Sequence, residues 1–181
     1  MSFVSWYNIG MNNQAFIDGQ NLYLGTEQTT PKWHVDFKKF RVYLKEKYHV
    51  SRAYYFMGAY DSSKKAKNLY TSLKTAGYIL IFREHTESVV SKKKGNVDTD
   101  IVFTIMRKIA DREKFDKAIL VSGDGDYWRM VDYLISKNKF AKLLSPSKKS
   151  TSSLYAQRTS DVFRDFLDSP SIKKKIEYNK K

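Results

Sequence analysis

The sequence predicts an α/β protein in which a central, mostly parallel sheet of about five strands lies between two layers of helices. Two observations carry this prediction. Short apolar runs alternate along the chain with longer segments in which apolar residues recur at helical spacing, an order typical of parallel strands joined by crossover helices. In addition, 181 residues with a hydrophobic fraction of 41% suffice for one domain with a packed core.

The first half of the chain supplies three of the expected strands, which are rich in apolar and aromatic residues: 14–18, 51–57 and 78–82. Residues 19–21 are predicted to form a turn after the first of these strands. One helix is expected after Asp36, a candidate N-cap, and another after Asp61 or Ser62, ending at Gly77. The predicted order of this half is therefore strand, helix, strand, helix, strand.

The second half continues the alternation. Helices are expected at 96–110 and 127–136, and strands at 118–121 and 140–144. One or two short helical or extended pieces are expected within 151–168.

The domain itself is predicted to span residues 14–168. Residues 1–13 show no clear period and are interpreted as a leader. The segment 84–95 is polar, carries three consecutive lysines and is expected to be a mobile loop. The basic tail, 169–181, is expected to be solvated.

The charge balance favours a polyanionic partner. Thirty-three Lys and Arg against nineteen Asp and Glu give a formal charge of +14, which attracts RNA or DNA through counterion release. The plainer alternative is a basic surface that serves solubility. The chain has no apolar run near the roughly 20 residues of a membrane span. It also has no secretory-signal pattern at its start and no cysteine, so we predict a cytoplasmic protein without thiolate metal sites.

Aspartates follow two of the predicted strands. Asp18 ends the run AFID, and Asp124 and Asp126 follow AILV within the turn SGDGDY. Ligands of open α/β sheets bind at the carboxyl ends of the strands, and Mg²⁺ or Mn²⁺ takes carboxylate oxygens and waters. These aspartates are therefore candidate metal ligands, with Asn21 and Ser122 as polar companions. Each aspartate taken alone can also be a turn former or a helix cap.

Helical phase favours Asp98 over Asp100 in the helix expected at 96–110. The apolar residues of this helix cluster on one side: Ile101, Val102, Ile105, Met106 and Ile109. At about 100° per residue, Asp98 lies near the centre of that side and Asp100 lies about 200° round from it. An inward carboxylate is costly unless it is paired or metal-bound. We therefore favour Asp98 as a ligand, keep Asp100 as the second choice, and note helix capping by Asp98 as the competing interpretation.

Other catalytic patterns do not occur in the sequence. His34, His49 and His85 lie in unrelated contexts without metal-ligand spacing, and there is no P-loop, GxGxxG or GxSxG motif. A haloacid-dehalogenase phosphatase would carry an aspartate two residues after Asp18, where this chain has Gln20. A carboxylate metal site is therefore the leading hypothesis.

Four stretches of the sequence resemble the motifs of the NYN domain, in the LabA-like branch of the PIN-like nucleases. They are AFIDGQNLY from residue 15, KGNVDTDIV from residue 94, AILVSGDGDY from residue 118 and SPSKKSTSSL from residue 145. They occur in the family's order over about residues 14–168. The resemblance implies a PIN-like, Rossmann-like three-layer sandwich with an acidic cleft.

The resemblance also implies a ribonuclease that depends on Mg²⁺ or Mn²⁺. It places the family's metal-site aspartates, which are also the catalytic residues, on Asp18, Asp98, Asp124 and Asp126. Many relatives carry a further acidic residue in the helix where this chain has Thr104, so the number of metals is left open.

Substrate contacts are expected around this cleft. The candidates for contact with the backbone phosphates are Asn21, Ser122, Lys94, Lys148, Lys149 and Ser150. Tyr23 and Trp128 are candidates for stacking a base, although core packing is the favoured interpretation for Trp128.

The predicted function is hydrolysis of phosphodiester bonds in single-stranded RNA, with DNA as the alternative substrate. A non-catalytic RNA-binding or regulatory protein on the same fold is the competing class. A third and weaker hypothesis is an enzyme that acts on a nucleotide or a sugar and uses the SGDGDY turn to bind a metal–phosphate complex. The oligomeric state, a homodimer included, is left open.

Overall fold

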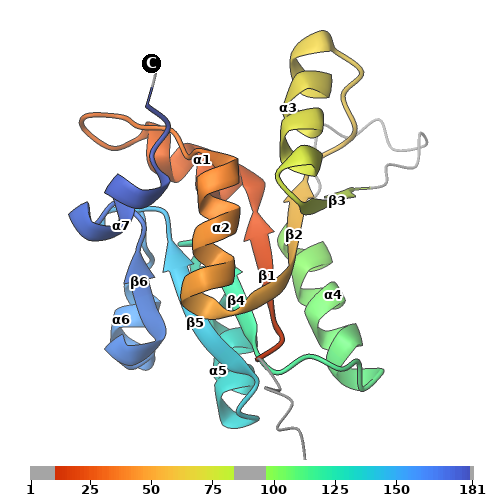
Figure 1. Cartoon of the computed structure of the whole chain (residues 1–181). Coiled ribbons are helices and arrows are strands. Elements are labelled where there is room, and N and C mark those ends of the chain that lie inside the picture. The colour runs from red at the N-terminus through yellow and green to blue at the C-terminus, as the bar shows by residue number, and fades with distance from the viewer. Residues whose placement is uncertain (1–10, 84–96, 180–181) are drawn as a thin grey trace, which may run out of the picture.

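The computed structural model describes residues 11–83 and 97–179 and contains a six-stranded sheet in the order β3-β2-β1-β4-β5-β6 (Figure 1). Every strand pairs with its neighbours in the parallel sense. The strands are β1 (Asn13–Asp18), β2 (Val50–Met57), β3 (Tyr78–Phe82), β4 (Ala118–Val121), β5 (Phe140–Ser145) and β6 (Arg164–Phe166). The predicted α/β class is confirmed, and the strand beyond the expected five is the short edge strand β6.

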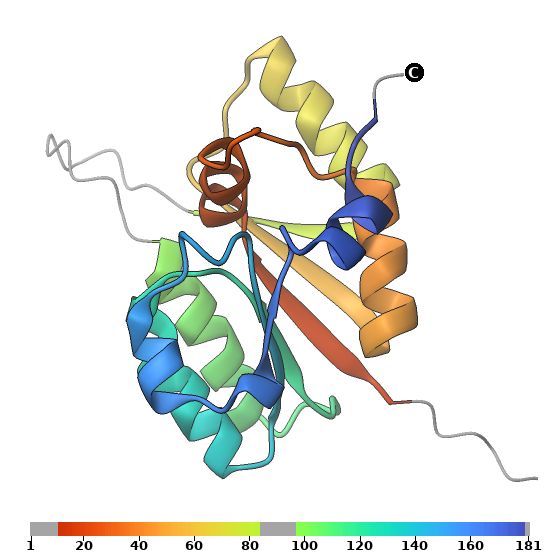
Figure 2. The same ribbon diagram turned by 90° about the vertical axis from the view of Figure 1, so that its left-hand side faces the viewer.

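Helices cover both faces of the sheet, as Figure 2 shows in a view along the sheet. One face carries α2 (Phe37–Tyr48), α3 (Lys64–Thr75) and α7 (Pro170–Ile176). The other carries α4 (Val97–Ala110), α5 (Trp128–Ser136) and α6 (Ser153–Arg158). Two short 3-10 turns, η1 (Gly125–Tyr127) and η2 (Asp161–Phe163), and one further helix, α1 (Gly19–Glu27), complete the fold.

Alternation along the strands produces two separate hydrophobic cores. In β1, Ala15 and Ile17 belong to the core under α2, while Phe16 belongs to the core under α4 and α5. Phe40 of α2 and Ile101 of α4 are completely buried on these opposite sides. The sheet is thus apolar on both faces, as expected for a parallel sheet between two helical layers.

The helix boundaries follow from local capping chemistry. Asp36 caps α2, as predicted, because its carboxylate accepts a hydrogen bond from the Lys39 amide at 3.0 Å. Helix α3 begins slightly later than predicted, because the hydroxyl of Ser63 accepts from the Ala66 amide at 3.2 Å. Gly77 follows α3 with φ of 90°, a left-handed conformation that favours glycine.

Helix α1 corrects the sequence prediction of a turn at residues 19–21. Its buried positions include two glycines and Thr26 beside Leu22, so the apolar periodicity that identifies a helix is weak. The glycine at position 25 permits close packing: a Cβ there would lie 2.5 Å from the Cβ of Pro146 in the loop after β5. The helix is therefore specified by tertiary contact rather than by pattern.

The expectation of a solvated tail after residue 169 is wrong for the residues that form α7. Ile176 is completely buried in the core under α2, and the Asp36 amide donates to its carbonyl at 2.8 Å. Lys173 lies over the ring of Trp33, 5.4 Å from its centroid. The lysine run suggested solvent, whereas Ile172 and Ile176, four residues apart, form an apolar side that docks.

Two further predictions concern the ends and the long loop. Asn13, assigned to the leader, is the first residue of β1. The predicted polar loop at 84–95, including Lys94, lies outside the described residues. Within 11–83 and 97–179, none of the helices combines the length and apolar character that crossing a membrane requires.

Candidate metal centre

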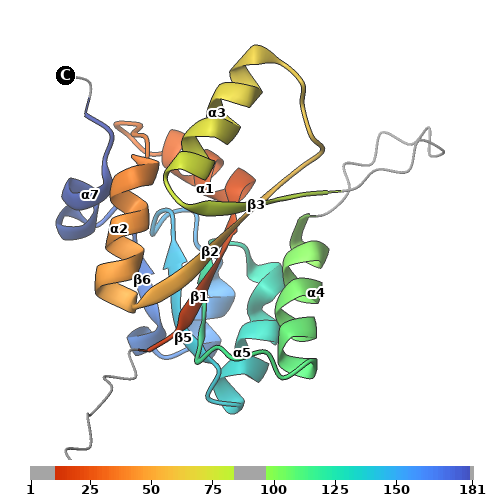
Figure 3. The same cartoon turned by 45° about the vertical axis from the view of Figure 1, so that its right-hand side comes forward.

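The order of the strands creates a switch point between β1 and β4. From β1 the chain continues outward to β2 and β3, and the later strands β4, β5 and β6 extend the sheet in the opposite direction. Asp18 is the last residue of β1 and Val121 the last residue of β4, so the loops after both strands meet at one edge. In Figure 3, α1 continues directly from the end of β1 at this edge. Ligands of such sheets bind at this kind of position.

Three aspartates converge at this edge. Each of Asp98, Asp124 and Asp126 offers one carboxylate oxygen, and these oxygens lie within 4.8 Å of one another. Asp98 comes from the first turn of α4, Asp124 from the loop after β4 and Asp126 from η1. Asp98 and Asp124 are half-buried and Asp126 is exposed, so the cluster faces solvent on one side.

Asp100, the second choice from the sequence, lies outside this cluster. Its carboxylate is 3.8 Å from the guanidinium of Arg83, at the end of β3, and the two side chains are partly exposed. Helical phase therefore separates the two aspartates of α4: one faces the loop after β4 and the other faces Arg83.

Asp18 is buried beside the cluster, with 5% of its surface exposed. One of its carboxylate oxygens caps α1 by accepting from the Asn21 amide at 2.9 Å. The other lies 3.1 Å from the hydroxyl of Tyr127, which is 2.5 Å from a carboxylate oxygen of Asp98. A single tyrosine hydroxyl thus connects Asp18 to the three-aspartate cluster.

The surroundings of Asp18 oppose its ionisation. Burial raises the pKa of the Asp18 carboxyl, and the negative charges of Asp98 and Asp124 raise it further. The hydrogen bonds from the Asn21 amide and the Tyr127 hydroxyl act in the opposite direction. Burial and the carboxylates of Asp18 and Asp98 also raise the pKa of Tyr127, so its hydroxyl keeps its proton and remains a donor. A nearby cation would offset this accumulation of negative charge.

Three hydrogen bonds between side chains and backbone amides hold the turn that carries Asp124. The side-chain oxygen of Asn21 accepts from the Gly123 amide at 2.8 Å, and the Ser122 hydroxyl accepts from the Asp124 amide at 3.1 Å. Asp124 in turn accepts from the Asp126 amide at 3.0 Å. Asn21 and Ser122, expected to contact substrate, therefore have bonds to the protein that shape this turn.

The loop after β5 packs against the same turn. The Ser152 amide donates to the Gly123 carbonyl at 2.9 Å, and a Cβ at position 123 would lie 2.9 Å from the Ser150 carbonyl oxygen. Ser150 bonds to Ser147 at 2.7 Å within the loop. The predicted phosphate contacts Lys148 and Lys149 are both exposed. Loop residue Ser150 is thus engaged internally, while the two lysines face solvent.

Two buried tyrosines were missed by sequence reasoning. The hydroxyl of Tyr127 links Asp18 to Asp98, and the hydroxyl of Tyr155 donates to the Asp124 carbonyl at 2.6 Å. For Tyr127 a signal existed, because the buried Met130, Val131 and Leu134 follow at i+3, i+4 and i+7. An inward tyrosine needs a polar partner for its hydroxyl. The partner of Tyr155 depends on a loop packing that no local pattern indicates.

The donor set fits a hard divalent cation. All three ligand groups are carboxylates, which suit Mg²⁺ and Mn²⁺, and the chain contains no cysteine. Oxygens bound to one Mg²⁺ lie at most about 4.2 Å apart, twice the usual Mg–O distance. At most a small side-chain rotation would therefore bring the three aspartates around one ion. These residues form an acidic cluster at the switch point of a three-layer α/β fold.

The comparison with known families agrees with this class. Residues 14–167 match the family model described as the NYN domain. The chain belongs to the NYN domain family, which is a family of PIN-like nucleases.

Two known proteins align with most of the chain. The chain is 24% identical over 170 residues to the low amplitude and bright protein LabA of Synechococcus elongatus. That alignment covers 90% of this chain and 86% of LabA. A crystal structure of a protein of unknown function from Vibrio parahaemolyticus aligns with a TM-score of 0.72 at 19% identity. The alignment covers 90% of this chain and 96% of the other, so the two proteins share the fold.

Proposed function

We propose that the protein is a metal-dependent ribonuclease that hydrolyses phosphodiester bonds in single-stranded RNA. The carrying observation is the convergence of Asp98, Asp124 and Asp126 within 4.8 Å at the switch point of the sheet. Membership of a PIN-like nuclease family and the net charge of +14 support the choice of a nucleic acid as substrate.

In this proposal Asp98, Asp124 and Asp126 hold Mg²⁺ or Mn²⁺, and Asp18 completes the acidic site. When bound, such an ion would stabilise negative charge on the phosphate and would lower the pKa of the water that serves as nucleophile. Tyr127 orients Asp98 through its hydroxyl at 2.5 Å. Asn21 and Ser122 keep the Asp124 turn in place, since their oxygens accept from its backbone amides. Exposed Lys148 and Lys149, on the loop beside this turn, attract the phosphate backbone.

Substitution of Asp124 by asparagine tests this function. The asparagine oxygen can still accept from the Asp126 amide, so we expect the turn to persist while one metal ligand is lost. RNA cleavage in Mn²⁺ should fall by at least about 100-fold, because even residues that only orient metal ligands cost about 10–100-fold. Cleavage of matched RNA and DNA oligonucleotides would be measured with Mn²⁺, with Mg²⁺ and with EDTA.

Asp100→Asn is the matched control, because Asp100 lies on the same helix as Asp98 but pairs with Arg83. This variant should cleave RNA at close to the parental rate. Equal activity of the Asp124→Asn and parental proteins would contradict the proposal. Tight RNA binding without cleavage under any metal condition would instead support a non-catalytic RNA-binding protein.

A further inference from the structure

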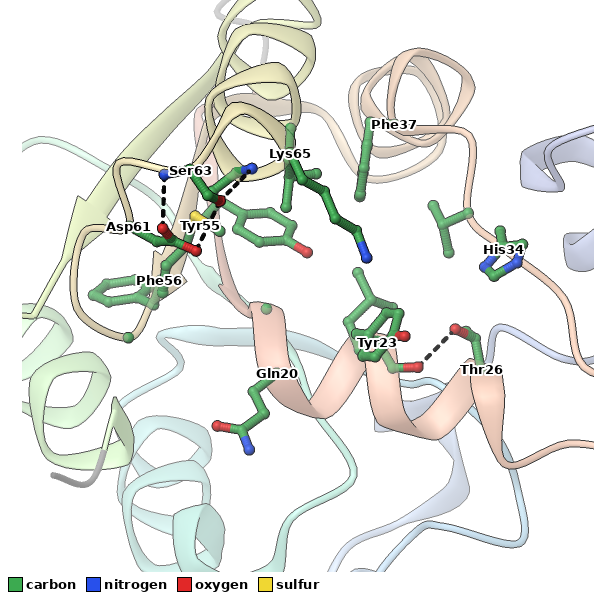
Figure 4. Close-up of a pocket in the computed structure, with 17 residues that line it drawn as sticks. Gln20, Tyr23, Thr26, His34, Phe37, Tyr55, Phe56, Asp61, Ser63 and Lys65 are labelled. Atoms are coloured by element: carbon green, nitrogen blue, oxygen red, sulfur yellow. Dashed lines mark hydrogen bonds between the residues drawn. The ribbon is translucent and has the colours of Figure 1, made fainter. Parts of the chain in front are cut away.

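A second feature lies directly beside the acidic edge. A cavity of about 640 Å³ opens between the first turns of α1, the end of β2 and the start of α3 (Figure 4). Its lining begins at Gly19, the residue after Asp18, and includes residues from the loop before α3. The volume lies within the usual range for pockets that bind small organic groups. The cavity is thus adjacent to the proposed catalytic site but separate from its carboxylate cluster.

The hydroxyl of a buried tyrosine faces this cavity. Tyr55 of β2 is 96% buried, since only 4% of its surface is exposed, and its ring packs edge-on against Phe37 with centroids 5.8 Å apart. Figure 4 shows the Tyr55 hydroxyl pointing into the cavity, toward the space that Lys65 also enters. This hydroxyl has no hydrogen-bond partner among the described residues, and its oxygen is open to the cavity rather than enclosed by protein. A hydroxyl both donates and accepts hydrogen bonds, so this group can bond a ligand that enters the cavity.

The walls of the cavity suit a flat aromatic group. Tyr23 of α1 is 58% exposed, and in Figure 4 its ring lies on one side of the cavity with Phe37 on another. Leu22 and Leu69 add apolar lining. Burying a charged phosphate against these side chains would be unfavourable, because the phosphate would lose its water without gaining a partner. Lys65, an exposed residue of α3, reaches into the space of the cavity with its ammonium group, as Figure 4 shows, and can pair there with an anionic group of a ligand.

We propose that this cavity binds one unpaired nucleobase of a single-stranded RNA whose backbone continues to the acidic edge. The base stacks on Tyr23, bonds through its edge to the Tyr55 hydroxyl, and leaves its phosphate near Lys65. A base can enter only when it is free of a partner strand, so the cavity selects single strands over duplexes. This inference rests on the proposed function, because it specifies the form of the RNA substrate.

Binding measured in EDTA separates the cavity from catalysis. The affinity of the full chain for a single-stranded RNA oligonucleotide would be measured by fluorescence anisotropy, for the parent and for three variants: Tyr23→Ala, Tyr55→Phe and Lys65→Ala. We expect about tenfold weaker binding for Tyr23→Ala, the usual effect of losing one stacked base. Tyr55→Phe should bind about fivefold more weakly. Lys65→Ala should make the slope of log binding constant against log salt concentration shallower, by the amount that corresponds to about one phosphate contact.

Matched controls lie on surfaces away from the cavity. Tyr133→Ala removes a tyrosine of α5 that is 41% exposed, and Lys67→Ala removes an exposed lysine of α3 that does not line the cavity. Both should bind RNA like the parent. Tyr55→Phe keeps the ring and its packing, and thermal denaturation would verify that each variant is folded.

The outcomes distinguish the two proposals. Weaker binding of the cavity variants with no cleavage by the parent supports the cavity and overturns the nuclease. Metal-dependent cleavage together with parental RNA affinity in all three cavity variants overturns the cavity and leaves the nuclease standing. Equal loss of affinity for single-stranded and duplex RNA also overturns the cavity proposal, and so does binding of free adenosine monophosphate that RNA does not displace.

Discussion

At the scale of single residues, the surroundings of Asp18 have opposite effects on its pKa. Its carboxylate caps α1 through the Asn21 amide, which favours the charged form, while burial and the neighbouring aspartates raise its pKa. A raised pKa in the folded state means that ionisation of Asp18 opposes folding when no cation is bound. This cost is consistent with a residue retained for a function rather than for stability.

Asp18→Asn should therefore stabilise the metal-free protein at neutral pH. An asparagine can still accept from the Asn21 amide, and its NH₂ group can donate to the Tyr127 hydroxyl while that hydroxyl donates to Asp98. In the parent, Asp18 lowers the free energy of unfolding as the pH rises from the carboxyl's pKa in the unfolded chain through its raised pKa in the folded protein. The variant should thus melt higher than the parent at pH 7 in EDTA, and the difference should vanish below about pH 4.

Asp36→Asn is the control for this measurement. Asp36 caps α2 in the same way, through the Lys39 amide at 3.0 Å, but it is less buried than Asp18. It should show no gain at neutral pH. A lower melting temperature for Asp18→Asn than for the parent at pH 7 would contradict the electrostatic account of Asp18.

At the scale of elements, α7 shows how a basic segment can still belong to the core. Three consecutive lysines in its last turn suggest solvent exposure, yet Ile176 is completely buried and Tyr178 donates its amide to the His34 carbonyl at 2.8 Å. Lys174 and Lys175 lie on the exposed side of the helix, whereas Lys173 lies over the Trp33 ring and pairs with Glu177. The helix therefore covers α2 and the loop before it.

Ile176→Ala should destabilise the protein by about 2–4 kcal/mol, because it removes a fully buried aliphatic side chain from this contact. Chemical denaturation followed by circular dichroism would measure the change. Lys175→Ala, on the exposed side of the same helix, should change stability by less than about 0.5 kcal/mol. Equal stability of both variants and the parent would mean that the segment is solvated, as the lysine run alone suggests.

At the scale of the whole molecule, charge and topology act together. The formal charge of +14 favours attraction of a polyanion, whereas the strand order brings the candidate carboxylates together at one edge of the sheet. The cavity lining includes Gly19, the residue after Asp18, and Tyr127 links Asp18 to Asp98 of the acidic cluster. In the proposed function, the net charge attracts RNA and the acidic cluster acts on it.

RNA affinity should accordingly fall steeply with salt. For a single strand that neutralises several lysines, the logarithm of the binding constant should fall with the logarithm of salt concentration with a slope between about −2 and −5. Titrations in EDTA at several potassium chloride concentrations would give the slope. A slope near zero would show that the positive charge serves solubility and does not bind a polyanion.

Much of this architecture follows from local patterns. β3 and β4 begin and end where the apolar runs predict, at residues 78–82 and 118–121. Asp98 and Asp100 face different surroundings, as helical phase predicts. The prediction failed at α1, whose buried side is formed partly by glycines, because periodicity measures side chains and cannot detect close backbone packing.

The sequence by itself determined the α/β class, the caps and strands that local chemistry specifies, the net charge and the identity of the candidate carboxylates. Only the tertiary structure decided that the Tyr127 hydroxyl contacts both Asp18, which is 109 residues away in the sequence, and Asp98. It likewise decided that the Asn21 side chain accepts a hydrogen bond from the Gly123 amide. It also decided that Tyr55 opens onto a cavity beside the acidic edge. The physical reason is that periodicity and capping act within a few residues, whereas these contacts depend on which strands become neighbours in the sheet.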